Sequence, residues 1–212
     1  MKTINISFAI TACNEAYELS RLLEQLDECM IDGDQITVQL DQSKLDNETL
    51  KVVSDYMPSK KVDGQKTFVS LDGNFADFKN SIKKHCTKDY IFFIDADEEV
   101  NVEQINLLRE ILSLNPTIDV FLIPRINTVE GLTQEHISKW RWNVNEDGWI
   151  NWPDYQTRIC RNVPEIKWVG AVHERLEGHS TMSPLPAEAI IALGHHKSIA
   201  RQEQQNKFYD TI

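Results

Sequence analysis

The 212-residue sequence contains no run of lysines and arginines, no closely spaced cysteine pair and few glycines. Its 33 acidic residues outnumber the 22 basic ones, which gives a formal net charge of −11. Extended nucleic-acid binding is therefore disfavoured, because it needs a basic surface. The four cysteines are far apart in the sequence, so they predict neither a zinc site nor a disulfide framework and are typical of a reducing compartment.

Long apolar runs are also missing. No stretch approaches the roughly 20 apolar residues of a membrane-spanning helix. Asn5 and Ser7 interrupt the first apolar segment, MKTINISFAI, which therefore does not resemble a secretion signal. We expect a cytoplasmic protein without a transmembrane segment, either free or peripheral to a membrane.

Strand-like and helix-like segments alternate through the first half of the chain. The strand-like segments are residues 4–10, 35–41, 66–71 and 89–95, and the helical ones are residues 17–30, 47–57, 75–86 and 101–112. Asn101 and Gln104 fit a cap at the start of the last helix, whose Val102 is predicted to face inward. This alternation predicts an α/β fold with a mostly parallel sheet and helices on both faces.

The pattern changes after Pro116. Residues 119–127 form one predicted strand, and residues 130–164 carry four of the five tryptophans with little periodicity. Such long irregular segments are often functional. Further strands are predicted at residues 166–176 and 187–196, and a polar helix at residues 199–209.

The segment YIFFIDADEEV, residues 90–100, places four carboxylates directly after an apolar strand. Ligands of parallel α/β sheets bind at the carboxyl ends of strands. Asp95 and Asp97 are two residues apart, so they can converge while Ala96 points into the fold. Two oxygen ligands of this kind suit Mg²⁺ or Mn²⁺. The alternative is an acidic loop before a helix, which explains Glu98 and Glu99 but accounts less well for the aspartate pair.

Several segments, in consistent order, resemble family 2 glycosyltransferases of the GT-A fold. The segments ISFAITACNEAYELSRLLEQL and VQLDQSKLDNET are similar to the family's first two strands with their turns, and FADFKNSIKKHCTKDYIFFIDADEEV to its Lys-Asn helix and DxD strand. The segments WPDYQTRICRN, VGAVHERL and LGHHK resemble the branch that includes bacterial lipopolysaccharide-core glucosyltransferases. The resemblance implies a GT-A fold, a nucleoside-diphosphate-sugar donor of the UDP-linked kind, and inversion at the anomeric carbon. We expect one domain over residues 1–212, with a nucleotide-sugar-binding half at 1–98 and an acceptor and catalytic half at 99–212.

The resemblance assigns nucleotide binding to the ends of the first two strands, at Ala12, Glu15 and Asp41. Each also has a simpler explanation, since Ala12 is small enough for close packing, Glu15 suits a first helical turn and Asp41 suits a strand-ending turn. The resemblance also brings Lys79 and Asn80 toward the donor, although Lys79 could instead be solvated.

At the acidic strand end, Asp95 is expected to face ribose or sugar, and Asp97 to hold the Mn²⁺ or Mg²⁺ ion. A late histidine is expected near the metal or the diphosphate, and alternation lets only one of His195 and His196 face the site. His195 is preferred. Arg158 is expected to bind a donor phosphate, or alternatively a neighbouring carboxylate.

Inversion requires a base near the acceptor hydroxyl. Asp154 and Glu174 are the two candidates, with Asp154 preferred; its structural alternative is an ion pair with Arg158. A glycan is the favoured acceptor, while a protein side chain or a hydroxylated nucleic-acid base remains open. The tryptophans between residues 140 and 152 are expected either to form a platform for a sugar ring or to pack as a small core.

Two other functions compete with sugar transfer. A nucleotidyltransferase would also bind a nucleotide and a metal, but its first turn is usually rich in glycine, and the turn TACNEAYE has none. A catalytically silent nucleotide- or glycan-binding protein would keep the fold without turnover.

Overall fold

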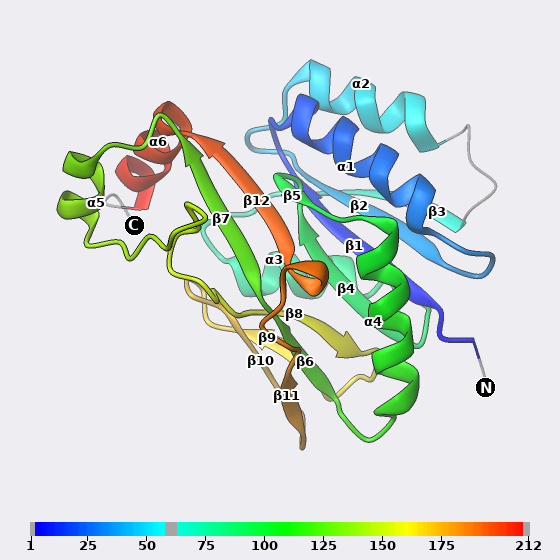
Figure 1. Cartoon of the computed structure of the whole chain (residues 1–212). Helices are drawn as coiled ribbons and strands as arrows, with labels where there is room; N and C mark the ends of the chain where they lie inside the picture. The colour runs from blue at the N-terminus through cyan, green and yellow to red at the C-terminus, as the bar shows by residue number, and fades with distance from the viewer. Residues whose placement is uncertain (1–2, 58–62, 210–212) are drawn as a thin grey trace.

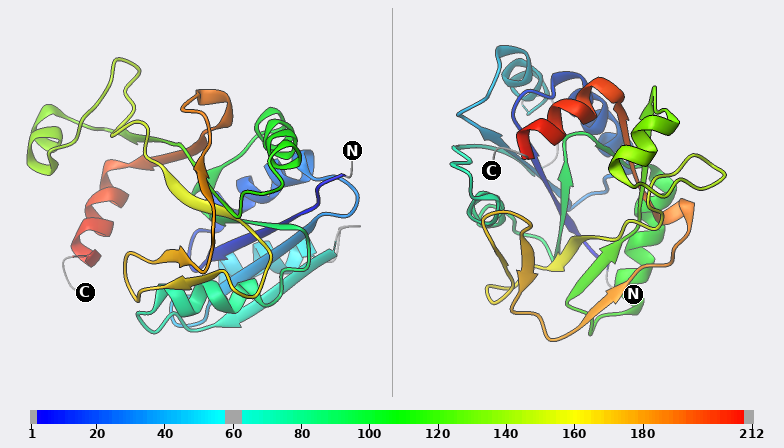
Figure 2. Two further views of the ribbon diagram at one scale, coloured as in Figure 1. Left: turned by 90° about the horizontal axis from the view of Figure 1, so that it is seen from below. Right: turned by 90° about the vertical axis from the view of Figure 1, so that its left-hand side faces the viewer.

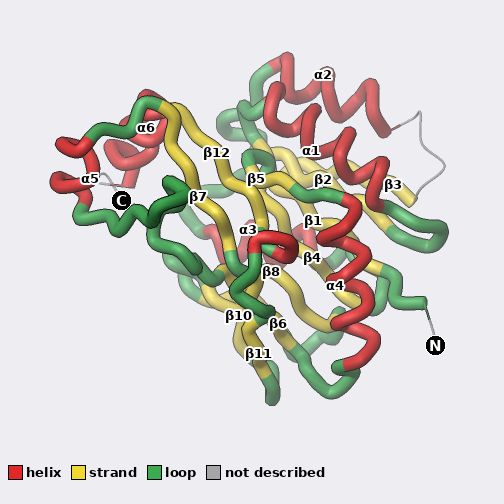
Figure 3. The backbone as a smooth tube through the Cα atoms, in the orientation of Figure 1, coloured by secondary structure: helices red, strands yellow, loops and turns green. Residues whose placement is uncertain are grey.

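A computed structural model describes residues 3–57 and 63–209, and its centre is a seven-stranded sheet (Figures 1 and 3). The strands are β1 (Ile6–Ala12), β2 (Gln35–Asp41), β3 (Asp63–Val69), β4 (Tyr90–Asp95), β6 (Val120–Ile123), β8 (Gln156–Arg161) and β11 (Met182–Pro184). Their order is β11-β6-β8-β4-β1-β2-β3. Only β8 runs antiparallel to its neighbours in this sheet as described. The predicted α/β fold with a mostly parallel sheet is therefore confirmed.

Helices cover both faces of the sheet. They are α1 (Ala16–Cys29), α2 (Asn47–Tyr56), α3 (Phe75–Lys83) and α4 (Val102–Leu114). Figure 2 shows α3 on the face opposite α1 and α4. The central strands are buried on both faces, so Phe8 packs in the cluster that contains the α1 leucines, while Ala9 packs with Ile82 of α3.

The sequence determines where α4 begins. Asn101 accepts from the backbone N–H of Gln104, whose side chain accepts in return from the backbone N–H of Asn101, as the capping pattern predicted. Val102 is 41% exposed, so the prediction that it faces inward was wrong. As the first residue of the helix it precedes the buried stripe that starts at Gln104 and Ile105.

The second half adds smaller units around this sheet. The strands β5 (Glu98–Glu99), β12 (Leu193–Ser198) and β7 (Arg125–Glu130) form a three-stranded sheet, and β9 (Lys167–Val169) pairs with β10 (Arg175–Glu177). The remaining helices are α5 (Gln134–Trp140), the 3₁₀ turn η2 (Ala189–Ile191) and α6 (Ile199–Tyr209). Among the residues described, no helix combines the length and the apolar character needed to cross a membrane.

Three strand predictions in this half need correction. Pro124 divides the strand predicted at residues 119–127 into β6 and β7, because proline cannot continue the ladder of hydrogen bonds. Residues 166–176 form the β9–β10 hairpin, and residues 187–196 begin as η2, with strand only from Leu193. The segment predicted to be irregular, residues 130–164, contains α5 and also β8, which lies inside the main sheet.

The order β3-β2-β1-β4 fixes where a ligand can bind. The connection from β1 to β2 leaves in one direction along the sheet, and β4 lies on the other side of β1. The divergence leaves a crevice at the carboxyl ends of β1 and β4, where open α/β sheets bind ligands.

Candidate active site

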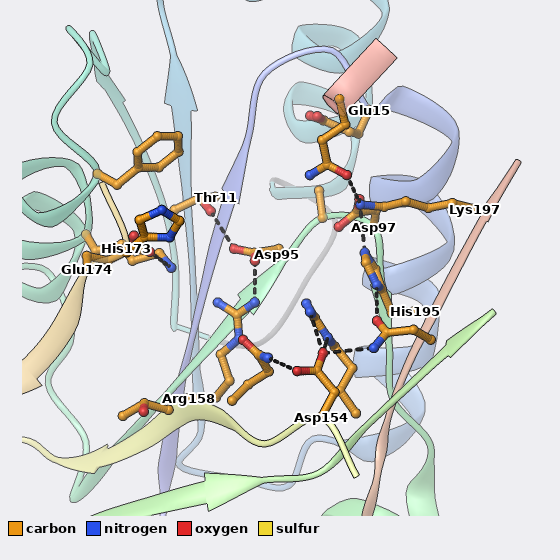
Figure 4. Close-up of a pocket in the computed structure, with 18 of the residues that line it drawn as sticks. Thr11, Glu15, Asp95, Asp97, Asp154, Arg158, His173, Glu174, His195 and Lys197 are labelled. Atoms are coloured by element: carbon orange, nitrogen blue, oxygen red, sulfur yellow. Dashed lines mark hydrogen bonds and ion pairs between the residues drawn. The ribbon is translucent and has the colours of Figure 1, made fainter. Parts of the chain in front are cut away.

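A cavity of about 1020 Å³ lies at this crevice, at the upper end of the volumes typical of ligand pockets. The ends of β1 and β4 form its floor, and β7, β8, β12, α3, α6 and the hairpin loop at residues 170–174 contribute to its walls. Figure 4 shows the charged side chains that converge there. The cavity therefore combines residues from both halves of the sequence.

Asp95 ends β4 directly beside the end of β1. The pairing register places it next to Thr11, whose hydroxyl donates to Asp95 Oδ1 at 3.3 Å. Asp97 follows on the same side, and Ala96 between them is buried. The two carboxylates thus line one cavity, the geometry expected from their spacing.

Asp95 belongs to a charge network, which we define as Asp95, Glu98, Arg125 and Arg158. Arg158 donates to Asp95 and, at 2.7 Å, to Glu98 Oε1, while Arg125 lies 3.2 Å from the same oxygen. The side chain of Glu98 is fully buried. Burial alone would raise the pKa of Asp95, but the positive charges of Arg158 and Lys79 outweigh it and hold that pKa well below the usual range.

Asp97 is contacted by two groups from β12. His195 Nε2 lies 3.6 Å and Lys197 Nζ 3.2 Å from Asp97 Oδ2. Burial opposes ionisation, yet these two neighbours hold the pKa of Asp97 far below its ordinary value. His196 points away, is exposed and pairs with the Thr128 hydroxyl. Of the two histidines, it is thus His195 that lines the cavity.

A chain of hydrogen bonds fixes how His195 is presented. The side-chain N–H₂ of Asn127 donates to Asp154 Oδ2 at 2.8 Å, which turns Asn127 Oδ1 toward His195 Nδ1 at 2.6 Å. Because that oxygen only accepts, Nδ1 donates to it, and the ring is fixed with its Nε2 toward Asp97. A carboxylate oxygen and an imidazole nitrogen that face each other at 3.6 Å can both bind one divalent ion.

Asp97 and His195 therefore provide part of the ligand set of a divalent ion. Asp97 supplies a carboxylate and His195 an oriented imidazole, the combination that Mn²⁺ accepts. Within residues 3–57 and 63–209, no group of three or more histidine, cysteine, aspartate or glutamate side chains is placed to bind a metal alone. The remaining ligands would have to come from substrate oxygens and water.

The two candidate bases lie on different walls. Asp154 Oδ2 accepts from Arg125 at 2.8 and 3.0 Å, and Oδ1 accepts from Gln156 at 2.8 Å. The charge of Arg125 and these hydrogen bonds outweigh burial and lower the pKa of Asp154. The ion pair expected between Asp154 and Arg158 is not observed, because Arg158 is turned toward β4 and its partners are Asp95 and Glu98.

Glu174, the second candidate, forms an ion pair with Lys79 at 2.6 Å, and the Lys79 ammonium lies 4.7 Å from the centre of the Trp168 ring. Lys79 is thus buried rather than solvated. Asn80 is not among the described residues that line the cavity. Its side-chain amide donates to the backbone C=O of Trp168 and accepts from the backbone N–H of the same residue. Asn80 therefore attaches β9 to α3.

The predicted nucleotide residues line the cavity at the other end. Ala12 is buried beside the crevice. Glu15 Oε2 accepts from the backbone N–H groups of Cys13 and Asn14, at 2.8 and 3.0 Å. Asp41 Oδ1 accepts from the backbone N–H groups of Ser43 and Leu71. Both carboxylates hold turns and face the cavity. The simpler explanation is thus met for Asp41, whereas Glu15 holds the turn before α1 and not the first turn of that helix.

The tryptophans divide into two groups. Of the four between residues 140 and 152, it is Trp142 that lines the cavity. Trp140 stacks on His136 and contacts Trp142, while Trp149 packs edge to face on Trp152. The segment therefore forms two half-buried aromatic groups, one of which presents the Trp142 ring to the cavity.

Sequence reasoning missed three charged groups. Glu98 was attributed to a helix terminus, yet it is the buried centre of the charge network. Arg125 gave no signal, because a lone arginine on a strand is usually exposed. Lys197 could have been found, because it lies two residues after His195 and alternation puts both on one face.

Comparisons with known proteins match the sequence to a family and the fold to solved structures. The sequence matches the family model described as glycosyl transferase family 2 over residues 7–165. The crystal structure of residues 1–349 of S. aureus TarS aligns with a TM-score of 0.64 and 16% identity, over 91% of this chain and 60% of that one. Its complex with UDP-GlcNAc aligns with a TM-score of 0.65 and 16% identity, over 92% and 59%.

The chain spans less than two thirds of these TarS structures, and at 16% identity the likeness concerns the fold. No sequence among curated proteins matches the chain. The family model covers well over half of the residues, so the chain belongs to glycosyl transferase family 2 and has the GT-A fold.

Proposed function

We propose that the chain transfers a sugar from a UDP-linked donor to an acceptor hydroxyl, with a divalent ion and with inversion at the anomeric carbon. The acceptor we propose is a glycan, in line with the resemblance of the later motifs to lipopolysaccharide-core glucosyltransferases. The observation that supports the proposal most is the pair of Asp97 and His195, a carboxylate and an imidazole nitrogen that face each other at the crevice between β1 and β4.

The charges of the cavity support the need for an ion. Its described lining contains six carboxylates, at positions 15, 41, 95, 97, 154 and 174, and four basic side chains, at positions 79, 125, 158 and 197. Each of those four already pairs with a carboxylate. A diphosphate therefore meets a net negative site, which a divalent ion would correct.

Each residue is proposed to have one role. Ala12, Glu15 and Asp41 border the nucleotide, Asp95 faces the ribose or sugar, and Asp97 and His195 would hold Mn²⁺ or Mg²⁺. When bound, that ion would act as a Lewis acid for the departing diphosphate. Lys79 and Arg158 keep the carboxylates near the donor ionised and fixed. Asp154, or Glu174, accepts the proton of the acceptor hydroxyl.

The first turn argues against a nucleotidyltransferase. Such enzymes cradle phosphate with free backbone N–H groups, but here those of Cys13 and Asn14 donate to Glu15. A silent binding protein would share the cavity, so it must be distinguished by turnover.

Thermal shift with nucleotide sugars, with and without Mn²⁺, tests the proposal. Saturating UDP-sugar with Mn²⁺ should raise Tm by on the order of 5 °C, because binding stabilises the folded state by mass action. Asp97→Asn should lose the shift that depends on Mn²⁺, and Asp147→Asn, which removes an exposed carboxylate outside the cavity, should keep it. A normal Mn²⁺-dependent shift in Asp97→Asn would refute the assignment. If the protein binds nucleotide sugars but releases UDP from none of them, it is a catalytically silent binding protein.

A further inference from the structure

Lys197 is a buried ammonium group inside the cavity. Its side chain is 5% exposed and its Nζ contacts Asp97 Oδ2 at 3.2 Å (Figure 4). Its other hydrogen bond runs to Gln205 Oε1 of α6, at 2.8 Å. Lys197 and His195 therefore contact the same carboxylate oxygen of Asp97.

Lys197 differs from the other basic groups that line the cavity. Arg125 and Arg158 each hold two carboxylates and share the fully buried Glu98. Lys79 is held by Glu174 and by the ring of Trp168. Lys197 also has one carboxylate partner among the described residues, Asp97, but its other contact is the neutral amide of Gln205 and not a second carboxylate or an aromatic ring.

This arrangement puts Lys197 in competition with a divalent ion. An ion held between Asp97 and His195 uses the carboxylate that now compensates Lys197. A buried ammonium without its partner is costly, so Lys197 needs a new anion at that moment. A diphosphate that shares the ion supplies one, and the four-carbon stem of lysine allows the ammonium to move to it.

We propose that Lys197 is a charge-exchange group, which holds Asp97 while the site contains no ion and becomes a diphosphate ligand when the ion and the donor bind. This inference rests on the proposed function. It predicts opposite effects of one substitution on two binding steps, because removal of the ammonium frees Asp97 for the ion but leaves the diphosphate with one cation fewer.

The test measures Mn²⁺ binding and UDP binding separately in Lys197→Met. Mn²⁺ alone, followed by electron paramagnetic resonance, should bind on the order of tenfold more tightly than in the unaltered protein. UDP at saturating Mn²⁺, followed by calorimetry, should bind on the order of tenfold more weakly. Lys197→Arg, which keeps the charge, should remain near the unaltered protein in both, as should Lys207→Met on the exposed side of α6. Mn²⁺ affinity that stays the same or falls in Lys197→Met, or UDP affinity that does not fall, would overturn the proposal.

Two further measurements protect the test. If Lys197→Met does not fold, Lys197→Gln can still bond Gln205 and should show the same two shifts. In the unaltered protein, acetic anhydride should label Lys197 faster with Mn²⁺ alone than without it, and UDP should reverse the increase; labelling that Mn²⁺ does not change counts against exchange. If the unaltered protein fails to bind UDP with Mn²⁺ or Mg²⁺, the proposed function itself fails.

Discussion

Asn127 connects the two chemical roles proposed for the cavity, because one amide contacts Asp154 and His195 at once. The oxygen of that amide accepts from His195 Nδ1 and so fixes the ring with Nε2 toward Asp97. The amide also gives Asp154 one of the four hydrogen bonds that fix its carboxylate. The proposed base and the proposed metal ligand are therefore oriented by the same side chain on β7.

Asp154→Asn should lose most turnover while its affinity for donor and metal stays near normal, because the change removes the proton acceptor and little volume. The expected loss in kcat is about 10²- to 10⁴-fold, the usual contribution of a general base. Because Arg125 and its hydrogen bonds lower the pKa of Asp154, this carboxylate stays ionised through the neutral range. The fall in kcat that protonation of Asp154 causes should therefore begin at a pH below the ordinary pKa range of carboxyl groups.

Glu174→Gln is the matched variant, since it also exchanges a carboxylate of the cavity for an amide. Donor affinity should rise with it, because the cavity loses a negative charge and Lys79 loses the carboxylate that competes with the diphosphate, while turnover at saturating donor should persist. Near-normal turnover in Asp154→Asn together with loss in Glu174→Gln would move the base role to Glu174.

Single residues of the site could be predicted where local geometry decides. Residues two apart at a strand end must share a side, which placed Asp95 and Asp97 together and separated His195 from His196. Partners that are distant in the sequence could not be predicted. Glu98 meets Arg125 and Arg158 only because β7 and β8, which come from the second half, both begin at the same crevice.

At the scale of elements, α5 and residues 141–155 form an arm beside the cavity, and Figure 3 shows it as mostly loop outside the main sheet. Trp142 is the arm's ring at the cavity. Trp142→Ala should raise the acceptor KM about fivefold with unchanged UDP affinity, since a lost aromatic contact is worth about 1 kcal/mol. The measurement is transfer kinetics with an oligosaccharide that supports turnover.

Trp149→Ala provides the control, because this ring packs on Trp152 and does not line the cavity as described. It should lower stability and leave the acceptor KM near normal. Equal changes in acceptor KM for the two variants would mean that Trp142 does not contact the acceptor and that both changes act through the packing of the arm.

Helices and strands could be predicted where a local pattern of apolar residues marks them. Predictions failed where a strand depends on pairing with strands that are distant in the sequence. The strands β1 and β4 and the helix α1 could be predicted, because their apolar residues follow one another or form a leucine stripe within a short segment. The strand β8 carries two arginines and follows an irregular segment, so nothing local marks it as central. Its place between β6 and β4 follows from Ile159 and Cys160, which are fully buried there by strands distant in the sequence.

For the whole molecule, the fold keeps several carboxylates ionised inside one cavity of a chain that is already negative. The pKa values of Asp95, Asp97 and Asp154 are all lowered on folding. In the unfolded chain they return to about 3.9. Below about pH 5 the unfolded state therefore takes up protons that the folded state does not, and stability should fall with pH.

Urea unfolding between about pH 7 and pH 3.5 measures this dependence. A lowered carboxyl pKa stabilises the fold above the unfolded value, and that stability is lost as pH falls toward the folded value. Each such carboxylate adds up to about 1.4 kcal/mol per pH unit to the slope.

The double variant Asp97→Asn with Lys197→Met removes one carboxylate together with its cation, so its free energy of unfolding should decline less steeply in acid. Asp147→Asn, an exposed site outside the cavity, should keep the original slope. An unchanged slope in the double variant would show that Asp97 does not contribute to acid unfolding and that the decline arises elsewhere in the molecule.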